Sequence, residues 1–360
     1  MFSNEADHRR LVERARQVLS ADVFDFYAGG AGDETTLAAN ETSWRGVRLR
    51  PRVLRDVSLI DPRVTVLGRE LTVPVGVAPV GYQTLAHPEG EVAMARGARR
   101  AGALLTVSSR SSRRIEEVAA EAGPWWFQAY VMRDHGLTRE LVRRAAAAGA
   151  TAIVLTGDTP YLGRRRRDRD AGLIPDEVFG VNLGAGFDRA LAEQAPDVTY
   201  ADVARLRDVS GLPVVVKGVL RGDDARECVA AGASGVWVSN HGGRQLDGAI
   251  PTAEALPEVA DAVGDAAEVY ADGGVRTGVD VLRALALGAR MVFVGRPALW
   301  CLAVGGAEAV AAGLTELNGA LSRAMGLAGA ATTAEITREL ARSPLGIPWR
   351  SEGQTTDPAT

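Results

Sequence analysis

Short apolar segments alternate with amphipathic segments along most of this 360-residue chain. The apolar segments are rich in β-branched residues, which is typical of strands buried on both faces. We predict eight such strands, Val73–Val80, Leu104–Ser109, Trp125–Tyr130, Ala152–Asp158, Pro213–Gly218, Gly235–Asn240, Glu268–Asp272 and Met291–Arg296. Alternating strands and helices predict a parallel sheet covered by helices. Eight units over roughly 250 residues favour a closed (β/α)8 TIM barrel over an open doubly wound sheet.

A glycine between two small or apolar residues precedes four of the predicted strands. The segments are Ala101-Gly102-Ala103, Ala148-Gly149-Ala150, Ala231-Gly232-Ala233 and Leu287-Gly288-Ala289. A helix often ends on a residue with positive φ, which glycine adopts without steric cost. The four segments therefore predict the ends of helices that return to the sheet.

The segments outside this repeat are less regular. Residues 6–28 have the apolar spacing of one or two helices, and residues 306–326 have that of a further helix. Residues 159–198 are far longer than an ordinary connection after a strand, so we predict a lid over the barrel mouth. The polar tail from 351 to 360 is expected to be loose. We treat 1–360 as a single domain with its barrel at about 73–326.

Composition narrows the function further. The 41 basic and 45 acidic side chains give a net charge of −4, which argues against a nucleic-acid partner. Cys228 and Cys301 lie far apart in apolar patterns and predict buried thiols, with no metal-ligand spacing. No secretory signal and no apolar window of about 18 residues is evident. We expect a soluble cytoplasmic protein with no membrane and no metal.

The most distinctive stretch runs from Ser239 to Gly248 and follows the predicted strand Gly235–Asn240. It places His241 and Arg244 three residues apart in a glycine-rich turn. An imidazole transfers protons near neutral pH, and a guanidinium binds anions. The pair suits an acidic substrate that must lose a proton.

If the barrel is correct, polar residues at the other strand ends converge on the same rim. This set comprises Gly81, Ser108, Gln128, Tyr130, Thr156, Asp158, Lys217, Asp272–Arg276, Gly295 and Arg296.

On these residues the chain resembles the FMN-dependent α-hydroxy acid oxidase and dehydrogenase family, which includes glycolate, lactate and mandelate enzymes. The resemblance covers about residues 10–350. The motifs that carry it are Ala78-Pro79-Val80-Gly81, His87-Pro88-Glu89-Gly90-Glu91, Phe127-Gln128-Ala129-Tyr130, Thr156-Gly157-Asp158-Thr159-Pro160, Leu162-Gly163-Arg164-Arg165, Lys217-Gly218, Ser239 to Gly248, Asp272-Gly273-Gly274-Val275-Arg276 and Val294-Gly295-Arg296-Pro297.

The resemblance implies catalytic roles for several side chains. His241 would be the base, and Asp158 would orient it and stabilise its imidazolium. Arg244 and Arg165 would clamp the substrate carboxylate, although a run of four arginines such as that around Arg165 is more often a solvated face. Tyr130 would donate to the substrate oxygen, its alternative being a core tyrosine with a wet tip.

The same resemblance implies an FMN site across the barrel mouth. Lys217 would lie near flavin N1 and stabilise the reduced anion. Pro79, Val80 and Gly81 would line the flavin, while Ser108, Gln128, Thr156 and Ser239 would hydrogen-bond the ring edge. Gly274, Arg276, Gly295 and Arg296 would hold the phosphate, and Asp272 the ribityl hydroxyls.

Three departures from the family pattern bear on the substrate. Phe26 replaces a tyrosine that binds the substrate carboxylate in many members, and some relatives acting on hydroxymandelate-type substrates share the phenylalanine. Arg110 stands where glycolate oxidases carry a tryptophan; it would bind a second acidic group or point to solvent, and we slightly favour solvent. Gly81 replaces an alanine beside flavin N5, which leaves oxygen reactivity open.

We therefore expect an FMN-dependent oxidase of an (S)-2-hydroxy acid, mandelate-like or otherwise bulky, that yields the 2-oxo acid and hydrogen peroxide. The alternatives are oxidative decarboxylation, a dehydrogenase with another electron acceptor in place of O2, and an FMN-binding protein without turnover. A flavin-free isomerase or lyase is more distant. The resemblance also implies a homo-oligomer, with a homotetramer as the expected form.

Overall fold

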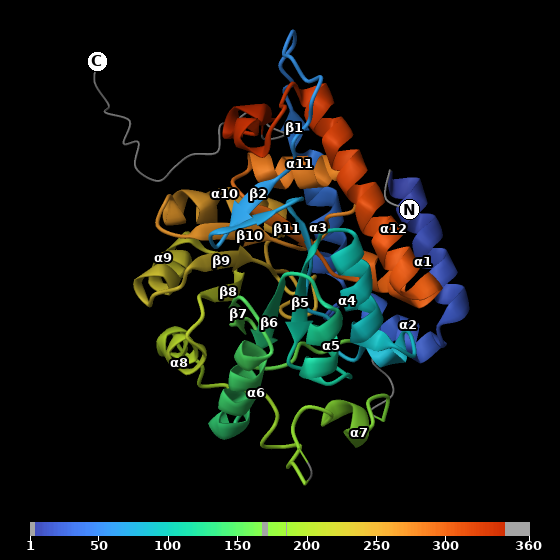
Figure 1. Ribbon diagram of the computed structural model, residues 1–360, viewed down its shortest axis with the longest axis vertical. Coiled ribbons are helices and arrows are strands. Elements are labelled where there is room, and N and C mark those ends of the chain that lie inside the picture. Colours follow the sequence, from blue (N-terminus) through green and yellow to red (C-terminus); the bar gives the residue numbers. More distant parts are fainter. Residues whose placement is uncertain (1–3, 168–171, 185, 343–360) are drawn as a thin grey trace.

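The barrel of the computed structural model is closed, and the model describes residues 4–167, 172–184 and 186–342 (Figure 1). Its eight parallel strands are β4 Val75–Val77, β5 Leu104–Ser108, β6 Trp125–Ala129, β7 Ile153–Thr156, β8 Val214–Val219, β9 Gly235–Val238, β10 Glu268–Ala271 and β11 Met291–Val294. The strands follow one another around the barrel, and β11 pairs with β4 to close it. The predicted (β/α)8 fold and all eight strands are confirmed; seven strands are shorter than predicted, and β8 is shifted by one residue toward the C-terminus.

Helices cover the outside of the barrel, one after each strand. They are α4 Gly90–Arg100, α5 Ile115–Glu121, α6 His135–Ala147, α8 Ala201–Ser210, α9 Gly222–Ala230, α10 Thr252–Val263, α11 Gly278–Ala286 and α12 Arg296–Ala328. The four glycines predicted to end helices, Gly102, Gly149, Gly232 and Gly288, all have positive φ. That prediction is confirmed.

The inside of the barrel is filled by aromatic rings. Trp237 stacks on Phe293 with ring centroids 3.9 Å apart, and Trp126 meets Tyr270 edge-on at 5.2 Å. These four side chains are at most 2% exposed. The barrel below the mouth is therefore a packed core, and chemistry is restricted to its rim.

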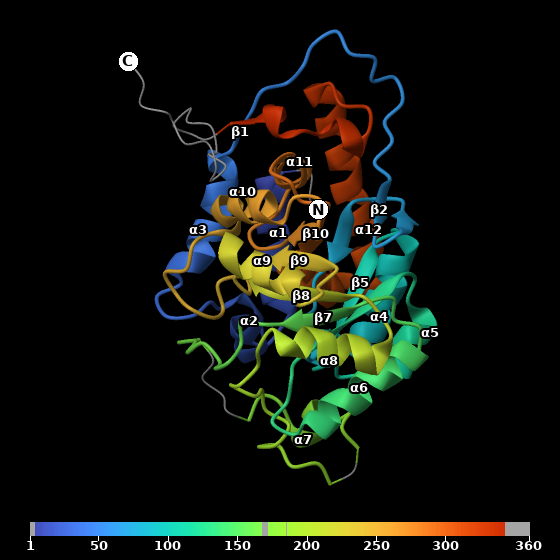
Figure 2. The same cartoon turned by 90° about the vertical axis from the view of Figure 1, so that its left-hand side faces the viewer.

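Segments outside the barrel cover its two ends. The helices α1 Glu5–Val18 and α2 Ala21–Ala28 confirm the prediction for residues 6–28, whereas α3 Thr35–Gly46 was missed. Also missed were the short pairs β1 Arg48–Leu49 with β12 Ala341–Arg342 and β2 Val64–Val66 with β3 Arg69–Leu71. The hairpin of β2 and β3 packs its apolar side chains against the barrel interior. Figure 2 shows the connection between β1 and β2 projecting from the molecule.

The predicted lid contains one short helix, α7 Asp176–Phe179, and is otherwise irregular over its described residues. It lies beside the strand ends, and several of its residues line the cavity described below. Residues 168–171 and 185 of this segment, and the predicted loose tail, lie outside the described residues. The single-domain boundary of 1–360 stays a prediction.

The segment α12, which is kinked where the backbone leaves helical geometry at Gly305 and Gly306, corrects one expectation from composition. It contains an 18-residue window with a mean hydropathy of 1.5, so an apolar window of membrane-spanning length does exist. However, 61% of that window is buried inside the protein, where α12 packs against α4, α11 and α1. Core helices of soluble proteins can be equally long and apolar, so α12 is weak evidence for a membrane span.

The contact between α4 and α12 depends on Gly97. A Cβ at this position would lie 2.6 Å from Cβ of Val310 and 2.7 Å from the carbonyl oxygen of Ala307. We expect Gly97→Ala to lower the free energy of unfolding by about 1–3 kcal/mol because overpacking outweighs the gain in helix propensity. In Gly319→Ala, on an open face of α12, the same change should raise it by up to about 1 kcal/mol. Urea unfolding measures both, and equal stability of Gly97→Ala and the wild type would contradict the packing argument.

Candidate active site at the barrel mouth

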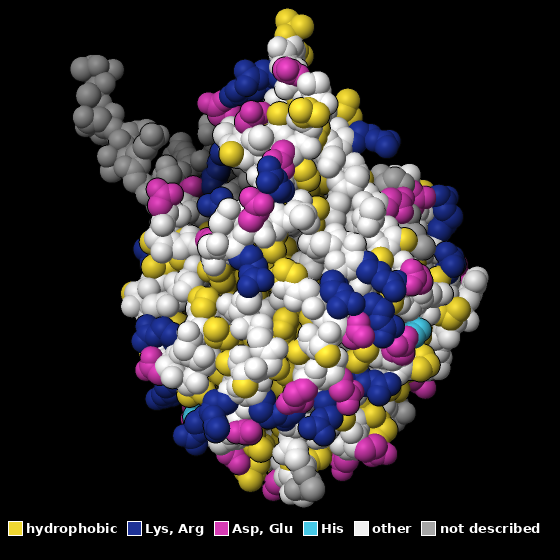
Figure 3. Space-filling model, viewed as in Figure 1, with side chains coloured by type: hydrophobic (Ala, Val, Ile, Leu, Met, Phe, Trp, Pro, Cys, Tyr) yellow, Lys and Arg dark blue, Asp and Glu magenta, His cyan; other side chains and the backbone are white. Residues whose placement is uncertain are grey.

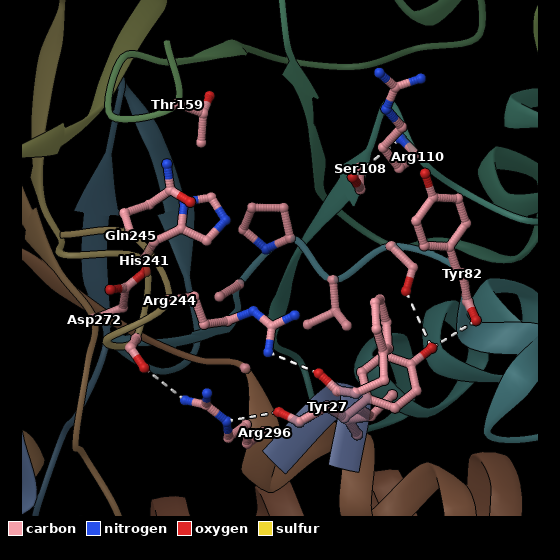
Figure 4. Close-up of a pocket in the computed structure, with 18 of the residues that line it drawn as sticks. Tyr27, Tyr82, Ser108, Arg110, Thr159, His241, Arg244, Gln245, Asp272 and Arg296 are labelled. Carbon is pink, nitrogen blue, oxygen red and sulfur yellow. Dashed lines mark hydrogen bonds between the residues drawn. The ribbon is translucent and has the colours of Figure 1, made fainter. Parts of the chain in front are cut away.

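A cavity of about 510 Å³ lies at the carboxyl ends of the strands. Residues from the strand ends, from α2 and from the lid line it together. Figure 4 shows His241 and Gln245 on one side of this cavity and Arg110 and Tyr82 on the other. The cavity contains most of the residues singled out in the sequence, which had been predicted to share this rim.

His241 and Asp158 form a hydrogen-bonded pair. Nδ1 of His241 lies 3.0 Å from Oδ1 of Asp158, and Nε2 of His241 lies 3.5 Å from the Tyr130 hydroxyl. Asp158 follows β7 and His241 follows β9, so the pair reaches past β8. The glycine at position 218 on β8 leaves space for this hydrogen bond, because a Cβ there would lie 2.6 Å from Cβ of Asp158.

The turn that carries His241 is left-handed. His241, Gly242 and Gly243 have φ of 58°, 64° and 76°. Histidine is among the few residues other than glycine that tolerate this region, and such conformations often occur at active sites. A Cβ at Gly243 would lie 2.6 Å from the backbone nitrogen of Leu37, so the turn fits tightly against α3.

The environment of His241 favours a neutral imidazole. Burial lowers its pKa, Asp158 opposes this, and the charges of Lys217 and Arg244 lower it further. Burial opposes ionisation of Asp158, but the charge that His241 carries when protonated, its hydrogen bond and the charge of Lys217 together lower the pKa of Asp158. Burial and Asp158 raise the pKa of Tyr130 to about 12, so its hydroxyl keeps its proton. The site therefore holds a free base, an ionised orienting carboxylate and a hydroxyl donor.

Arg244 and Arg165 bring two guanidinium groups to the cavity. Nη1 of Arg244 donates to the carbonyl oxygens of Phe26 and Gly29, both at 2.8 Å. In the run of four arginines, Arg166 and Arg167 instead form ion pairs with Asp33 and Glu34 outside the cavity lining. The structure thus separates Arg165 from its neighbours.

Phe26 and Tyr27 are adjacent but make different contacts, and the difference bears on substrate binding. The Phe26 ring lies in the cavity lining, with the Arg244 guanidinium 5.4 Å from its centroid. The Tyr27 hydroxyl donates to the carbonyl oxygen of Tyr82 at 2.6 Å and lies 3.2 Å from that of Gly81. Because this proton is committed to backbone, Tyr27 does not replace the hydroxyl absent from Phe26.

Lys217 is 3% exposed and belongs to a buried polar network. Its Nζ donates to Oγ of Ser239 at 2.9 Å and lies 3.5 Å from Oδ2 of Asp272. Ser239 donates to Oδ1 of Asp272 at 2.6 Å and accepts the backbone N–H of His241 at 3.1 Å. The network links three strand ends, and Asp272 balances the buried lysine charge.

A second polar chain crosses the neighbouring strands. Ser108 donates to Oε1 of Gln128 at 2.9 Å, and Nε2 of Gln128 donates to Oγ1 of Thr156 at 2.9 Å. Three residues predicted to face one ring edge are thus adjacent, on β5, β6 and β7.

The predicted phosphate end lies where β10 and β11 end. Gly274 is closely packed, since a Cβ there would lie 2.0 Å from the carbonyl oxygen of Asn40. Arg276 is paired with Glu41 at 2.8 Å. Arg296 donates to the carbonyl oxygens of Tyr27, Gly242 and Gly29 at 2.8, 2.8 and 2.9 Å. Burial and Arg276 lower the pKa of Arg296 to about 10.

These residues fit FMN. The α12 N-terminus begins at Arg296 beside Gly295, and a helix N-terminus next to two guanidinium groups favours a phosphate. Lys217 offers a fixed cation, and Pro79, Val80 and Gly81 form a wall. Arg296 already binds three carbonyls, so it positions the His241 turn as well as adding charge.

Arg110 corrects the expectation that it points to solvent. It is 5% exposed and lies in the cavity lining. Its Nη2 donates to the carbonyl oxygen of Ala192 in the lid at 2.6 Å, and its guanidinium lies 4.4 Å from the centroid of Phe179. Arg110 is buried because the lid packs onto the loop after β5. No sequence pattern indicated this packing.

Sequence reasoning also missed residues that hold the site in place. Asn40 and Asn240 exchange amide hydrogen bonds of 2.8 and 2.7 Å, which join α3 to the residue before His241. Gln245 donates to the carbonyl oxygens of Asp158 and Tyr161. Asn240 and Gln245 lie within the stretch from Ser239 to Gly248, so their place in the sequence could have identified them as site residues. No sequence pattern marks Asn40 in this way.

Comparison with known proteins agrees with this geometry. The family model for FMN-dependent dehydrogenases matches residues 15–343. The chain is similar to a 4-hydroxymandelate oxidase of Amycolatopsis orientalis, 47% identical over 89% of this chain and 93% of the relative. It is similar to an L-lactate oxidase of Nostoc sp., 44% identical over 89% and 94% of the two chains. A crystal structure of a mandelate oxidase superposes with a TM-score of 0.87 at 47% identity, covering 91% and 96% of the two chains.

The fold and site thus define a flavin enzyme of the TIM-barrel class. The chain belongs to the FMN-dependent dehydrogenase family, and FMN is its cofactor. The resemblance noted from the motifs is confirmed.

The pair of His241 and Asp158 predicts a pH dependence. Because the pKa of His241 is lowered from 6.5, kcat/KM should rise with pH through an apparent pKa below 6.5 and then level off. Asp158→Asn removes the charge that opposes this lowering, so the acid limb should move to lower pH. The plateau should fall by about 10²–10⁴-fold because the imidazolium loses its partner. Steady-state rates from pH 4 to 9 test this, with FMN absorbance as the control for folding, and an acid limb displaced to higher pH would refute it.

Proposed function

We propose that this protein oxidises an (S)-2-hydroxy acid with a bulky, mandelate-like side chain to the 2-oxo acid and passes the electrons to O2, forming H2O2. The observation that carries the proposal is the placement of His241 between Asp158 and Tyr130, in a cavity that also contains Arg165 and Arg244. A base, a hydroxyl donor and two anion-binding groups suit a substrate with adjacent hydroxyl and carboxylate groups.

The residues divide the work as follows. Arg165 and Arg244 bind the carboxylate and orient C2. Tyr130 donates to the substrate oxygen, and His241 accepts a proton while Asp158 stabilises the imidazolium. FMN, held beside Lys217, Arg276 and Arg296, would supply the two-electron acceptor needed to convert the C2 alcohol to a ketone. Oxidation of the alcohol releases two electrons and two protons in all, which is the number that O2 needs to become H2O2.

The preference for a bulky side chain rests on the cavity wall. Phe26, Tyr82 and Phe179 supply rings, and Leu173 and Ile174 add aliphatic surface. A wall of rings suits an aromatic side chain. Similar relatives named as oxidases of 4-hydroxymandelate and mandelate support the same substrate class.

Oxygen as acceptor, the homotetramer and a cytoplasmic location are further parts of this proposal. Relatives named as oxidases support oxygen. The buried free thiols Cys228 and Cys301 fit a reducing compartment. On the face in Figure 3, basic and acidic side chains are interspersed, in keeping with the expectation that nucleic acid is not a partner.

Anaerobic reduction tests the reaction directly. Mixed with a panel of aromatic and aliphatic 2-hydroxy acids, the yellow holoenzyme should lose its flavin absorbance fastest with (S)-mandelate-type compounds. Admission of air should restore the colour and release one H2O2 per 2-oxo acid. A carboxylic acid one carbon shorter, formed with CO2, would instead identify oxidative decarboxylation, and no bleaching with any compound would refute the proposed substrate class.

His241→Gln is the matched control for this experiment. The variant should bind FMN and remain yellow, because His241 lies on the substrate side of the predicted flavin site, but bleaching should slow by about 10²–10⁴-fold. Bleaching at the wild-type rate would remove His241 from the reaction.

A further inference from the structure

The guanidinium of Arg110 is buried, and few of its N–H donors have an acceptor among the described residues. Arg110 is 5% exposed, and among the described residues its guanidinium forms a hydrogen bond only from Nη2 to the Ala192 carbonyl oxygen. Nη1 has no acceptor among the described residues. Within the described ranges 4–167, 172–184 and 186–342, no carboxylate lies within 4.0 Å to form an ion pair. A buried cation in this condition is costly unless something else supplies an acceptor.

The neighbouring Arg189 shows the contrast. Its guanidinium lies 4.3 Å from the same Phe179 ring that Arg110 approaches to 4.4 Å. Arg189, however, is ion-paired with Asp176. Of these two cations beside one ring, only Arg189 has its charge balanced by a carboxylate in the described structure.

Arg110 is also held firmly in its place. Its carbonyl oxygen accepts the backbone N–H of Tyr82 at 2.9 Å, and its own N–H donates to Ser108. The buried carboxylate of Glu91 accepts from the backbone N–H groups of Gln83 and Ser112 and so joins the two loops on either side. The lid is fastened to the same loop, because Asn182 accepts the backbone N–H of Ile115 and donates to the Ser111 carbonyl.

The position of Arg110 relative to Tyr130 and His241 points to a role in substrate binding. Its guanidinium lies 5.9 Å from the centroid of the Tyr130 ring, whose hydroxyl is 3.5 Å from His241. Figure 4 shows Arg110 and Tyr82 across the cavity from His241. A substrate whose carboxylate is held by Arg165 and Arg244 would extend its side chain toward the wall of Tyr82, Phe179 and Arg110.

We propose that Arg110 selects 2-hydroxy acids whose side chain ends in an oxygen acceptor, a carboxylate more strongly than a hydroxyl. This inference rests on the proposed oxidation of 2-hydroxy acids. The distal oxygen of the substrate supplies an acceptor for Nη1 and a countercharge, neither of which the described residues place within contact distance of the Arg110 guanidinium. A guanidinium also binds a carboxylate with two parallel hydrogen bonds, which a hydroxyl cannot match.

The test compares mandelate with mandelates that carry a hydroxyl or a carboxylate at ring position 3 or 4. In the wild-type holoenzyme, the better carboxylate isomer should exceed mandelate in kcat/KM by about 10–100-fold, and the better hydroxyl isomer by about 2–10-fold. The Kd of the matching 2-oxo acids, from the perturbed flavin spectrum, should show the same order. Arg110→Met should bring these ratios close to one, and Arg110→Lys should keep part of the carboxylate preference.

Arg189→Met is the matched control. Arg189 contacts the same ring and also lines the cavity, but its guanidinium is already paired with Asp176, so the substrate ratios should stay as in the wild type. If Arg110→Met instead slows all substrates equally, Arg110 only fastens the lid and the inference is wrong. If mandelate and its derivatives all fail to bleach the flavin, the proposed function itself fails, which is a different result from bleaching without preference.

Discussion

The hydrogen bond between His241 and Asp158 crosses a strand, and much of the mouth is arranged to permit it. The two residues follow β9 and β7, so their side chains must meet above the end of β8. A side chain at Gly218 would occupy that space, and glycine there leaves Asp158 free to reach the imidazole. Lys217, the residue before it, turns instead into the network of Ser239 and Asp272. One strand end thus supplies both the gap for the acid–base pair and the cation expected beside the cofactor. This division requires a closed barrel, because only closure brings the strand ends to a common rim.

The N-terminal helices belong to the site as well as to the scaffold. The carboxyl end of α2 presents carbonyl oxygens, and the C-terminus of a helix favours cations. Arg244 and Arg296 both donate to the carbonyl oxygen of Gly29, and each donates to one further carbonyl of this helix. Arg296 also holds the carbonyl of Gly242, next to His241. The helix end therefore fixes the Arg244 guanidinium and the turn that carries His241 in one arrangement. This explains why a segment outside the barrel repeat carries Phe26 into the cavity.

The barrel and most of the rim followed from the sequence because both depend on local patterns. Buried strands, helix ends at Gly102, Gly149, Gly232 and Gly288, and polar residues after strands are all visible along the chain. What could not be predicted depends on contacts between distant segments. The hairpin of β2 and β3 is too short for a period to appear, and α3 lacks a side-chain cap to announce it. The burial of Arg110 is the clearest case. Its surroundings come from Ala192 and Phe179, which lie in an irregular segment far along the chain. Nothing in the spacing of that segment indicates which loop it covers.

The packing around Arg110 also explains why position 81 is a glycine. A Cβ at this position would lie 2.9 Å from Cβ of Arg110 and 3.1 Å from its carbonyl oxygen, and the next residue, Tyr82, donates its N–H to that oxygen. Alanine at 81 would therefore press on Arg110, and the backbone of Arg110 is held by Ser108 and Tyr82. Glycine at 81 and arginine at 110 are thus structurally linked in this chain. The absence of a side-chain methyl group at position 81 follows from how this wall of the cavity is built around Arg110. For that reason Gly81 alone does not argue against oxygen as the electron acceptor, and its effect on the flavin should be judged together with Arg110.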